Sequence, residues 1–236
     1  MLHYATIVNT AAVIIGSLFG IWMGKGLSEK MRKMMFTSIG LVSLAIGMSM
    51  TLKPLLDENL SYPGKPDFLL ILLSLLFGGL IGEYFEIENS LENLAKKVGG
   101  GGNFAKGFVT ASLLFTIGPM TIIGCLNIGL QGDANLILVK SFMDMISSSI
   151  LASLYGMGVL FSSVWVLLFQ GLLVSFANSL RFLAEPMYLA DLTSLGGLLV
   201  LAIGIRLLEI KDIKVGNFLP ALAIMPLADY IYSIVA

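Results

Sequence analysis

One apolar run carries the two residues best suited to chemistry inside a membrane, Lys140 and Asp144. They are four residues apart, so on a helix their side chains lie on one face, about 6 Å apart. An unpaired charge in an apolar span costs about 3 kcal/mol or more, and the spacing therefore predicts an ion pair. Such a pair either stabilises the helix bundle or belongs to a pathway for an ion or solute, the role that intramembrane ionisable residues favour.

A second interruption of the hydrophobicity precedes this pair, at Gly118-Pro119. Proline removes one backbone donor and clashes with the carbonyl four residues earlier, so the helix is predicted to kink or break between Phe115 and Pro119. Polar backbone groups freed at that depth need partners from protein or water. Three nearby side chains are candidates: Thr116, Thr121 and Asn127. The alternatives are a plain proline kink and a discontinuous helix whose ends bind an ion or substrate.

The predicted binding site combines this break with the Lys140/Asp144 face. Ser148 and Gln170 would extend a polar lining, although such residues also form ordinary interhelical hydrogen bonds. The candidate substrate- or ion-binding residues are Asp144, Lys140, Thr116, Gly118, Pro119, Asn127, Ser148 and Gln170. Weaker candidates for the same interior are Asn9, Asn178 and Asp229.

Enzyme chemistry has no support in the sequence. It contains no His pair, Cys pair, Gly-x-Ser-x-Gly motif or Walker motif, and its single cysteine, Cys125, lies in an apolar run. We therefore expect no catalytic site, no cofactor and no metal site. The net charge of −1 gives no reason to expect a nucleic-acid partner.

The surrounding chain has the composition of a membrane protein. Of its 236 residues, 57% are hydrophobic and 12% charged, whereas soluble domains carry about 25% charged residues. So little polar surface cannot cover a water-soluble globule, and the bilayer must be part of the solvent. We predict an all-α integral membrane protein.

Eight spans are predicted, because about 20 apolar residues cross the hydrocarbon core. They lie near residues 4–24, 34–52, 68–84, 107–129, 135–156, 159–180, 190–208 and 217–235, and form a single transmembrane domain over residues 1–236. Ten of the 14 Lys and Arg residues fall in alternate loops. Because cytoplasmic loops are enriched in Lys and Arg, these loops are predicted to be cytoplasmic. Both termini should therefore face outward.

Internal similarities suggest two inverted repeats. Thr37 to Gly47 resembles Thr193 to Gly204 with one insertion, and on the predicted topology these segments run in opposite directions. Secondary transporters are often built in this way, while chance similarity between apolar helices is the alternative. The predicted repeat halves are residues 1–98 and 159–236 around a central unit, 104–158. The span after each of these segments also begins alike, with Asp67-Phe68-Leu69 in one and Asn217-Phe218-Leu219 in the other. Each of these spans later contains an acidic residue followed by tyrosine, Glu83-Tyr84 and Asp229-Tyr230.

Two further patterns concern packing and partners. Gly16, Gly20 and Gly24 recur at i, i+4 and i+8, which favours close approach of another helix, within a protomer or across a homodimer. Residues 85–98 have helical hydrophobic spacing and predict a cytoplasmic amphipathic helix, with apolar positions Ile87, Leu91, Leu94 and Val98.

Several motifs together resemble a known bacterial family. They are Gly118-Pro119-Met120, Gly129-Leu130, Gly132-Asp133, Lys140-Ser141 with Asp144, Gly156-Met157-Gly158-Val159, Gln170-Gly171 and Leu219-Pro220-Ala221. The chain is similar over nearly its whole length to the domain of unknown function 554 family. The resemblance implies a multi-pass protein of the bacterial cytoplasmic (inner) membrane, at most a transporter, and implies no particular substrate.

The sequence thus favours a transporter or channel for a small solute or ion, dimeric and surrounded by lipid. Asp144 would bind the coupling cation or proton, and Lys140 would pair with it or attract an anionic substrate. The alternatives are a membrane scaffold or signalling protein acting through the 85–98 helix and, least favoured, an intramembrane enzyme. A water-accessible cavity that reaches Asp144 would favour transport, whereas a continuous fourth span with Lys140 and Asp144 buried in a dry interface would count against it.

Overall fold

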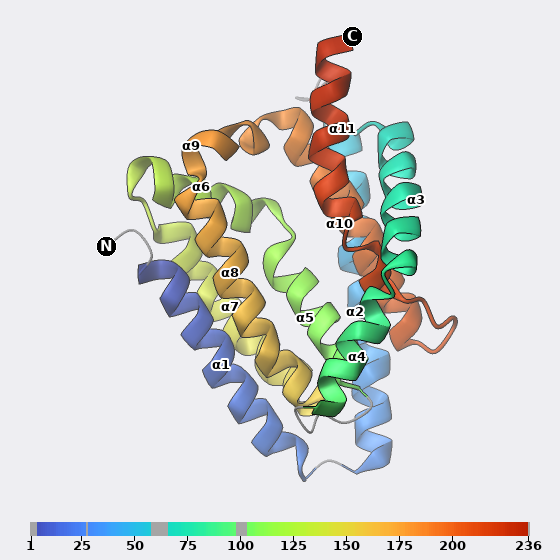
Figure 1. Ribbon diagram of the computed structural model, residues 1–236. Helices are drawn as coiled ribbons and strands as arrows, with labels where there is room; N and C mark the ends of the chain where they lie inside the picture. Colours follow the sequence, from blue (N-terminus) through green and yellow to red (C-terminus); the bar gives the residue numbers. More distant parts are fainter. Residues whose placement is uncertain (1–3, 27, 58–65, 98–102, 236) are drawn as a thin grey trace. The chain divides into compact units, whose positions relative to one another are not determined.

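The computed structural model describes residues 4–26, 28–57, 66–97 and 103–235 (Figure 1). Within these ranges every regular element is an α-helix or a short 3-10 helix, which confirms the predicted all-α membrane fold. The chain forms two compact units, each assembled from separate stretches. Unit 1 comprises Met1–Phe36 and Leu91–Arg181, and unit 2 comprises Thr37–Ser90 and Phe182–Ala236. These boundaries differ from those of the predicted repeat halves, which stay a prediction.

Unit 1 contains the helices that position the predicted site. They are α1 (Tyr4–Gly24), α5 (Phe104–Thr116), α6 (Pro119–Gln131), α7 (Asn135–Tyr155), α8 (Met157–Ser175) and α9 (Ala177–Leu180). Unit 2 contains α3 (Phe68–Tyr84), α10 (Pro186–Leu207), the 3-10 helix η2 (Val215–Phe218) and α11 (Ala221–Val235). Three elements cross the boundary between the units: α2 (Glu29–Leu56), α4 (Ile87–Lys97) and η1 (Arg181–Ala184).

Five helices in the described ranges are long and apolar enough to cross a membrane: α1, α2, α7, α8 and α10. The bent pair α5 and α6 makes a sixth if it is one broken span. The predicted count of eight is not confirmed, because α3 and α11 have 17 and 15 residues and a straight span needs about 20. The predicted division of the long apolar run near residue 156 agrees with the structure, since α7 ends at Tyr155 and is followed by Gly156, whose φ of 66° suits glycine.

The glycines of α1 pack α1 directly against α7. A Cβ added at Gly16, Gly20 or Gly24 would lie 2.2, 2.1 or 2.4 Å from a main-chain oxygen of α7. Those oxygens belong to Met145, Ser149 and Ser153 in turn, so the two helices run parallel. The close packing predicted from the glycine spacing therefore occurs within one chain, and large apolar side chains such as Trp22 lie on the exposed side of α1.

Glycines also allow close helix packing in unit 2, where the paired helices are antiparallel. Gly40 contacts Leu208, and Gly47 lies against the backbone of Gly197, which brings α2 against α10. Two glycines of α3 make similar contacts, Gly78 with Ala221 and Gly82 with Asn217. They place α3 beside η2 and α11, again in antiparallel order (Figure 1). Thr51 and Ser194 strengthen the α2 and α10 contact, because each hydroxyl donates to the other residue's carbonyl, at 3.4 and 3.3 Å.

Helix α4 occupies most of the predicted amphipathic segment at 85–98. Its first turn contains a buried acidic residue, because Glu88 is only 1% exposed. The Glu88 carboxylate forms a 2.5 Å ion pair with Arg206 and accepts the Gly216 amide at 2.9 Å. The side chain of Leu94 and all of Val98 lie outside the described residues, and the cytoplasmic position of α4 stays a prediction.

Candidate functional site

The predicted break lies between α5 and α6, whose axes differ in direction by 57°. Helix α5 ends at Thr116 and α6 begins at Pro119. Gly118 separates them with φ 154° and ψ 150°, a backbone conformation that residues other than glycine rarely adopt. Pro119 needs no amide partner at the first position of a helix. The Gly118-Pro119 sequence therefore ends one helix and starts another, as expected.

One threonine side chain near the break satisfies a carbonyl that Pro119 leaves without its usual amide partner. Thr121 donates its hydroxyl to the Phe115 carbonyl at 3.2 Å, as predicted. Thr116 instead donates within α5, to the Ser112 carbonyl at 2.5 Å, and accepts a 3.3 Å hydrogen bond from the Trp165 indole of α8. Asn127 lies about two helical turns beyond the break, where its main-chain oxygen accepts the Asp133 amide at 3.3 Å.

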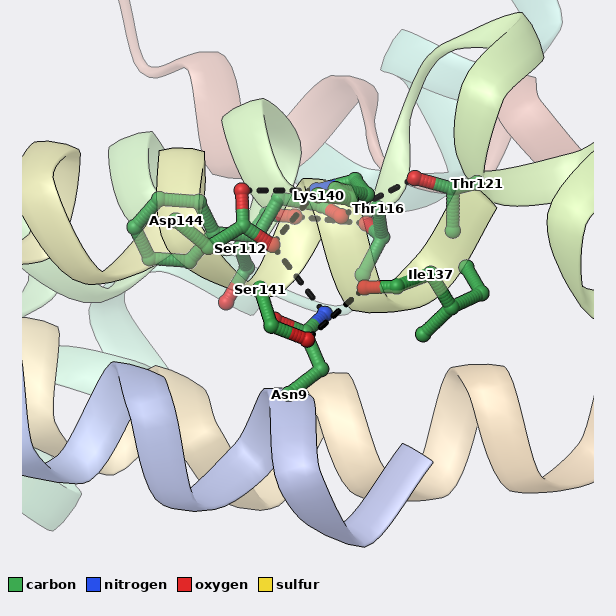
Figure 2. A network of polar contacts seen from close by, with 9 residues as sticks. Asn9, Ser112, Thr116, Thr121, Ile137, Lys140, Ser141 and Asp144 are labelled. Carbon is green, nitrogen blue, oxygen red and sulfur yellow. Dashed lines mark hydrogen bonds and ion pairs between the residues drawn. The ribbon is translucent and has the colours of Figure 1, made fainter. Parts of the chain in front are cut away.

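The predicted ion pair is formed on α7 (Figure 2). Lys140 Nζ lies 2.7 Å from Asp144 Oδ1 and 2.5 Å from Oδ2. Asn9 of α1 adds a second donor and a third hydrogen bond, with its Nδ2 3.1 Å from Asp144 Oδ2. Lys140 and Asp144 are 7% and 5% exposed, so two opposite charges are held almost out of solvent. Charge-assisted hydrogen bonds of this kind are about twice as strong as neutral ones.

The ion pair lies beside the helix break. Lys140 Nζ is 5.9 Å from the centre of the Phe115 ring, in the last turn of α5. A cation at this distance from a ring face is attracted by the ring's π electrons. The structure therefore brings together three elements that the sequence separates: the polar turn of α1, the end of α5 and the charged face of α7.

Two other predicted site residues have different surroundings. Ser148 donates to the Met145 carbonyl at 3.0 Å, and a Cβ on Gly16 would lie 2.2 Å from its Oγ, so Ser148 belongs to the α1 and α7 packing surface. Gln170 of α8 is fully buried, and neither its Nε2 nor its Oε1 has a hydrogen-bond partner among the described residues. A buried amide left unpaired costs about 1–3 kcal/mol per group, so Gln170 has hydrogen-bonding capacity that the described residues do not use.

The arrangement is electrically neutral but incomplete in its hydrogen bonds. Asp144 accepts three hydrogen bonds from two donors, Lys140 and Asn9, while Asn9 Oδ1 is buried without a partner in the described part of the chain. A proton or cation bound by Asp144 would weaken its hold on Lys140, and an anion would compete for Lys140. Among the described residues, no group of three or more His, Cys, Asp or Glu side chains is placed to hold a metal ion.

Sequence reasoning underestimated Asn9 and missed a second polar cluster. Asn9 was one weak candidate among several, because nothing in the sequence pairs residue 9 with residue 144. Asp191 was not singled out, although the structure buries it in unit 2 beside Asp229, with exposures of 1% and 0%. An acidic residue within each of two apolar runs was the available signal.

Comparison with known proteins identifies the family. The model for proteins of unknown function DUF554 matches residues 4–230. The chain belongs to this family. The uncharacterized membrane protein YdfK of Bacillus subtilis (strain 168) is similar to it, with 31% identity over 228 residues, covering 97% of this chain and 96% of YdfK.

A second DUF554 relative has a similar extent. The uncharacterized protein YqgA of Escherichia coli (strain K12) shares 32% identity over 232 residues, 94% of each chain. No solved structure matches the chain. The apolar helices and the relative described as a membrane protein agree that this DUF554 protein is a helical membrane protein.

Proposed function

We propose that this protein transports a small solute or ion across the bacterial cytoplasmic membrane, through a site in unit 1 between the α5/α6 break and α7. The observation that carries the proposal is the buried Lys140 and Asp144 pair beside a broken helix. Buried ionisable groups are costly in a membrane and mark ion or substrate pathways. Discontinuous helices place backbone ends at substrate and ion sites in secondary transporters.

The pair suggests how two ligands would be coupled. With Asp144 ionised, Lys140 is neutralised and its Nζ is engaged. A proton or cation on Asp144 would release the ammonium group, which would then attract an anion or the carboxylate of a zwitterionic solute. The two bound charges compensate each other, so the loaded site avoids the cost of an uncompensated charge in the membrane.

We also propose that the similar segments of α2 and α10 belong to an inverted repeat, and the directions of these helices support this. On α2 and α10 the similar segments share the pattern Gly-Leu-x-x-Leu-Ala-Ile-Gly, from Gly40 to Gly47 and from Gly197 to Gly204. Gly40 packs close to Gly204 and Gly47 against Gly197, so each end of one segment meets the opposite end of the other. A local two-fold axis in the membrane plane would produce such reciprocal contacts.

Ligand-induced stabilisation of the purified protein is the first test of transport. A ligand at 100 times its dissociation constant adds about 2.7 kcal/mol of stability, so thermal unfolding can be screened against Na⁺, K⁺, phosphate, sulfate, amino acids and small carboxylates. Each ligand that stabilises the protein is then assayed in proteoliposomes by charge movement and by an internal pH dye.

Matched variants connect that assay to the site. Asp144→Asn and Lys140→Gln should each abolish ligand-driven flux, whereas Lys25→Gln, which removes an exposed charge in the same unit, should preserve it. Full flux through the folded Asp144→Asn protein would refute the assignment of Asp144. Flux lost equally in Lys25→Gln would show that the assay reports general damage instead of the site.

The proposal includes outward-facing termini and a homodimer. Cys125 is fully buried, so the natural chain should react little with a membrane-impermeant maleimide. In spheroplasts Asp57→Cys should be labelled and Lys25→Cys should require permeabilisation; the reverse pattern would invert the topology. The mass of the detergent-solubilised particle, measured by light scattering, should correspond to two chains, and one chain would refute the dimer.

A further inference from the structure

Unit 2 contains a pair of buried carboxyl groups that the proposed transport site does not use. Asp191 of α10 and Asp229 of α11 are 1% and 0% exposed, and their side chains lie within hydrogen-bonding reach of each other. An ionised carboxylate has no proton to donate. Two ionised carboxylates in contact would repel, so a proton or cation must lie between them for the contact to be stable.

The hydrogen bonds around the pair are unequal. Asp191 Oδ1 accepts the Asp67 main-chain amide at 2.7 Å, whereas Asp191 Oδ2 has no donor among the described residues. Asp229 has no donor for either oxygen within the described part of the chain. An amide donor stabilises the charged form of a carboxyl group. The negative charge is therefore better placed on Asp191 and the proton on Asp229.

The neighbouring charges favour the same assignment. Asp67 caps α3 by accepting the amides of Leu69 and Leu70 at 2.9 and 3.3 Å, a role that suits its charged form. Its negative charge acts on both Asp191 and Asp229 and opposes a second and third negative charge nearby.

Two other charged residues of α3 and α10, Glu83 and Arg206, have partners of their own. At the other ends of α3 and α10, Glu83 pairs with Lys214 and Arg206 pairs with Glu88 and Asp212.

The internal similarity provides a natural comparison. Asp67 and Asn217 begin similar segments, and an acidic residue follows each, Glu83 after 16 residues and Asp229 after 12. Asn217 donates its amide Nδ2 to Glu83 Oε2 at 2.6 Å, which satisfies an ionised Glu83. At the corresponding place Asp67 has no amide to offer Asp229. Glu83 therefore accepts a hydrogen bond from an amide side chain, whereas Asp229 accepts none from the described residues.

A further polar group without a partner lies on α3. Ser74 is fully buried, and its Oγ has no hydrogen bond among the described residues. Gly78 packs against Ala221 in an antiparallel register, so Ser74, one turn earlier, faces α11 near Met225, one turn before Asp229.

We propose that Asp191 and Asp229 form a proton-binding site in which Asp229 holds the proton and donates its O–H to Asp191 Oδ2. The site binds one proton, and its loss leaves two adjacent carboxylates. It is separate from the Lys140 and Asp144 pair and does not depend on the transport proposal.

Infrared spectroscopy of the full chain in nanodiscs tests this site. The wild-type protein at neutral pH should show a protonated-carboxyl C=O band that shifts when aspartate is labelled with ¹³C and disappears on alkaline titration. Asp229→Asn should lose the band, because the asparagine amide supplies the donor and Asp191 stays ionised. Glu83→Gln is the matched control and should retain it, because Glu83 already has donors.

Stability provides the second readout. Alkaline pH should lower the melting temperature of the wild-type protein, because deprotonation leaves two adjacent carboxylates that repel. Asp229→Asn should remove this pH dependence without loss of stability at neutral pH. No aspartate band in the wild-type protein, or a band that survives in Asp229→Asn, would overturn the proposal. Stabilisation by Na⁺ with no such band would also overturn it, because the pair would then hold a metal cation.

Discussion

Removing one half of the Lys140 and Asp144 pair should destabilise unit 1 far more than removing both halves. Lys140→Met leaves Asp144, 5% exposed, with Asn9 as its recorded donor, and breaking a buried pair in this way costs about 3–5 kcal/mol. Asp144→Asn leaves the ammonium group 5.9 Å from the Phe115 ring, where cation–π attraction returns about 1 kcal/mol. This variant should therefore lose about 2–4 kcal/mol.

The double variant decides whether the loss comes from the pair itself. Lys140→Met with Asp144→Asn leaves no buried charge, and neutral replacements of buried pairs are often tolerated. We expect it to lose less than about 2 kcal/mol, which gives a coupling energy of about 3 kcal/mol or more in a double-mutant cycle.

Tryptophan fluorescence during unfolding by a denaturing detergent in mixed micelles measures these energies. Both tryptophans, Trp22 and Trp165, lie in unit 1, so their emission reports the unit that contains the pair. Lys25→Gln is the control for removing a lysine and should change the free energy of unfolding by less than about 0.5 kcal/mol. Additive losses, or a Lys140→Met variant as stable as the control, would refute the reasoning.

Two further predictions concern helix packing. Gly20→Val should destabilise unit 1 by more than about 3 kcal/mol, because even its Cβ would lie 2.1 Å from the Ser149 oxygen; Gly171→Ala, with open space at its Cβ, should be neutral or stabilising in the same unfolding assay. Arg206→Met should cost about 3–5 kcal/mol by leaving Glu88 buried without its cation, measured by thermal unfolding, and adding Glu88→Gln should recover part of it. An unchanged melting temperature in Arg206→Met would contradict the burial of this pair.

The sequence predicted those features of the site that depend on local covalent chemistry. Proline at 119 has no amide and clashes with the preceding turn wherever it occurs in a helix, so the break could be placed within a few residues. Lys140 and Asp144 share a face at i and i+4 in any α-helix. Both predictions concern neighbours along one chain segment, and the structure agrees with both.

Features that depend on contacts between distant helices could not be predicted in the same way. Ser148 continues the polar face of α7 in sequence, yet the packing of Gly16 turns that position into a helix contact. Asp191 and Asp229 come together through the packing of α10 with α11, which hydrophobic periodicity does not specify. The count of eight spans relied on hydrophobicity alone, which cannot distinguish a complete crossing from the shorter helices α3 and α11.

The parallel packing of α1 on α7 also has a consequence for biosynthesis. Asn9 and its partner Asp144 are separated by 135 residues, so at about 5–20 residues per second the ribosome makes Asp144 about 7–27 seconds after Asn9. During that time the glycine face of α1 is inserted without the helix that later covers it. Unit 2 has a similar delay, because Ser194, the hydrogen-bond partner of Thr51, is synthesised 143 residues later. Neither unit can acquire its native core until the ribosome has made most of the chain, so the early helices must be held by lipid or by the insertion machinery until then.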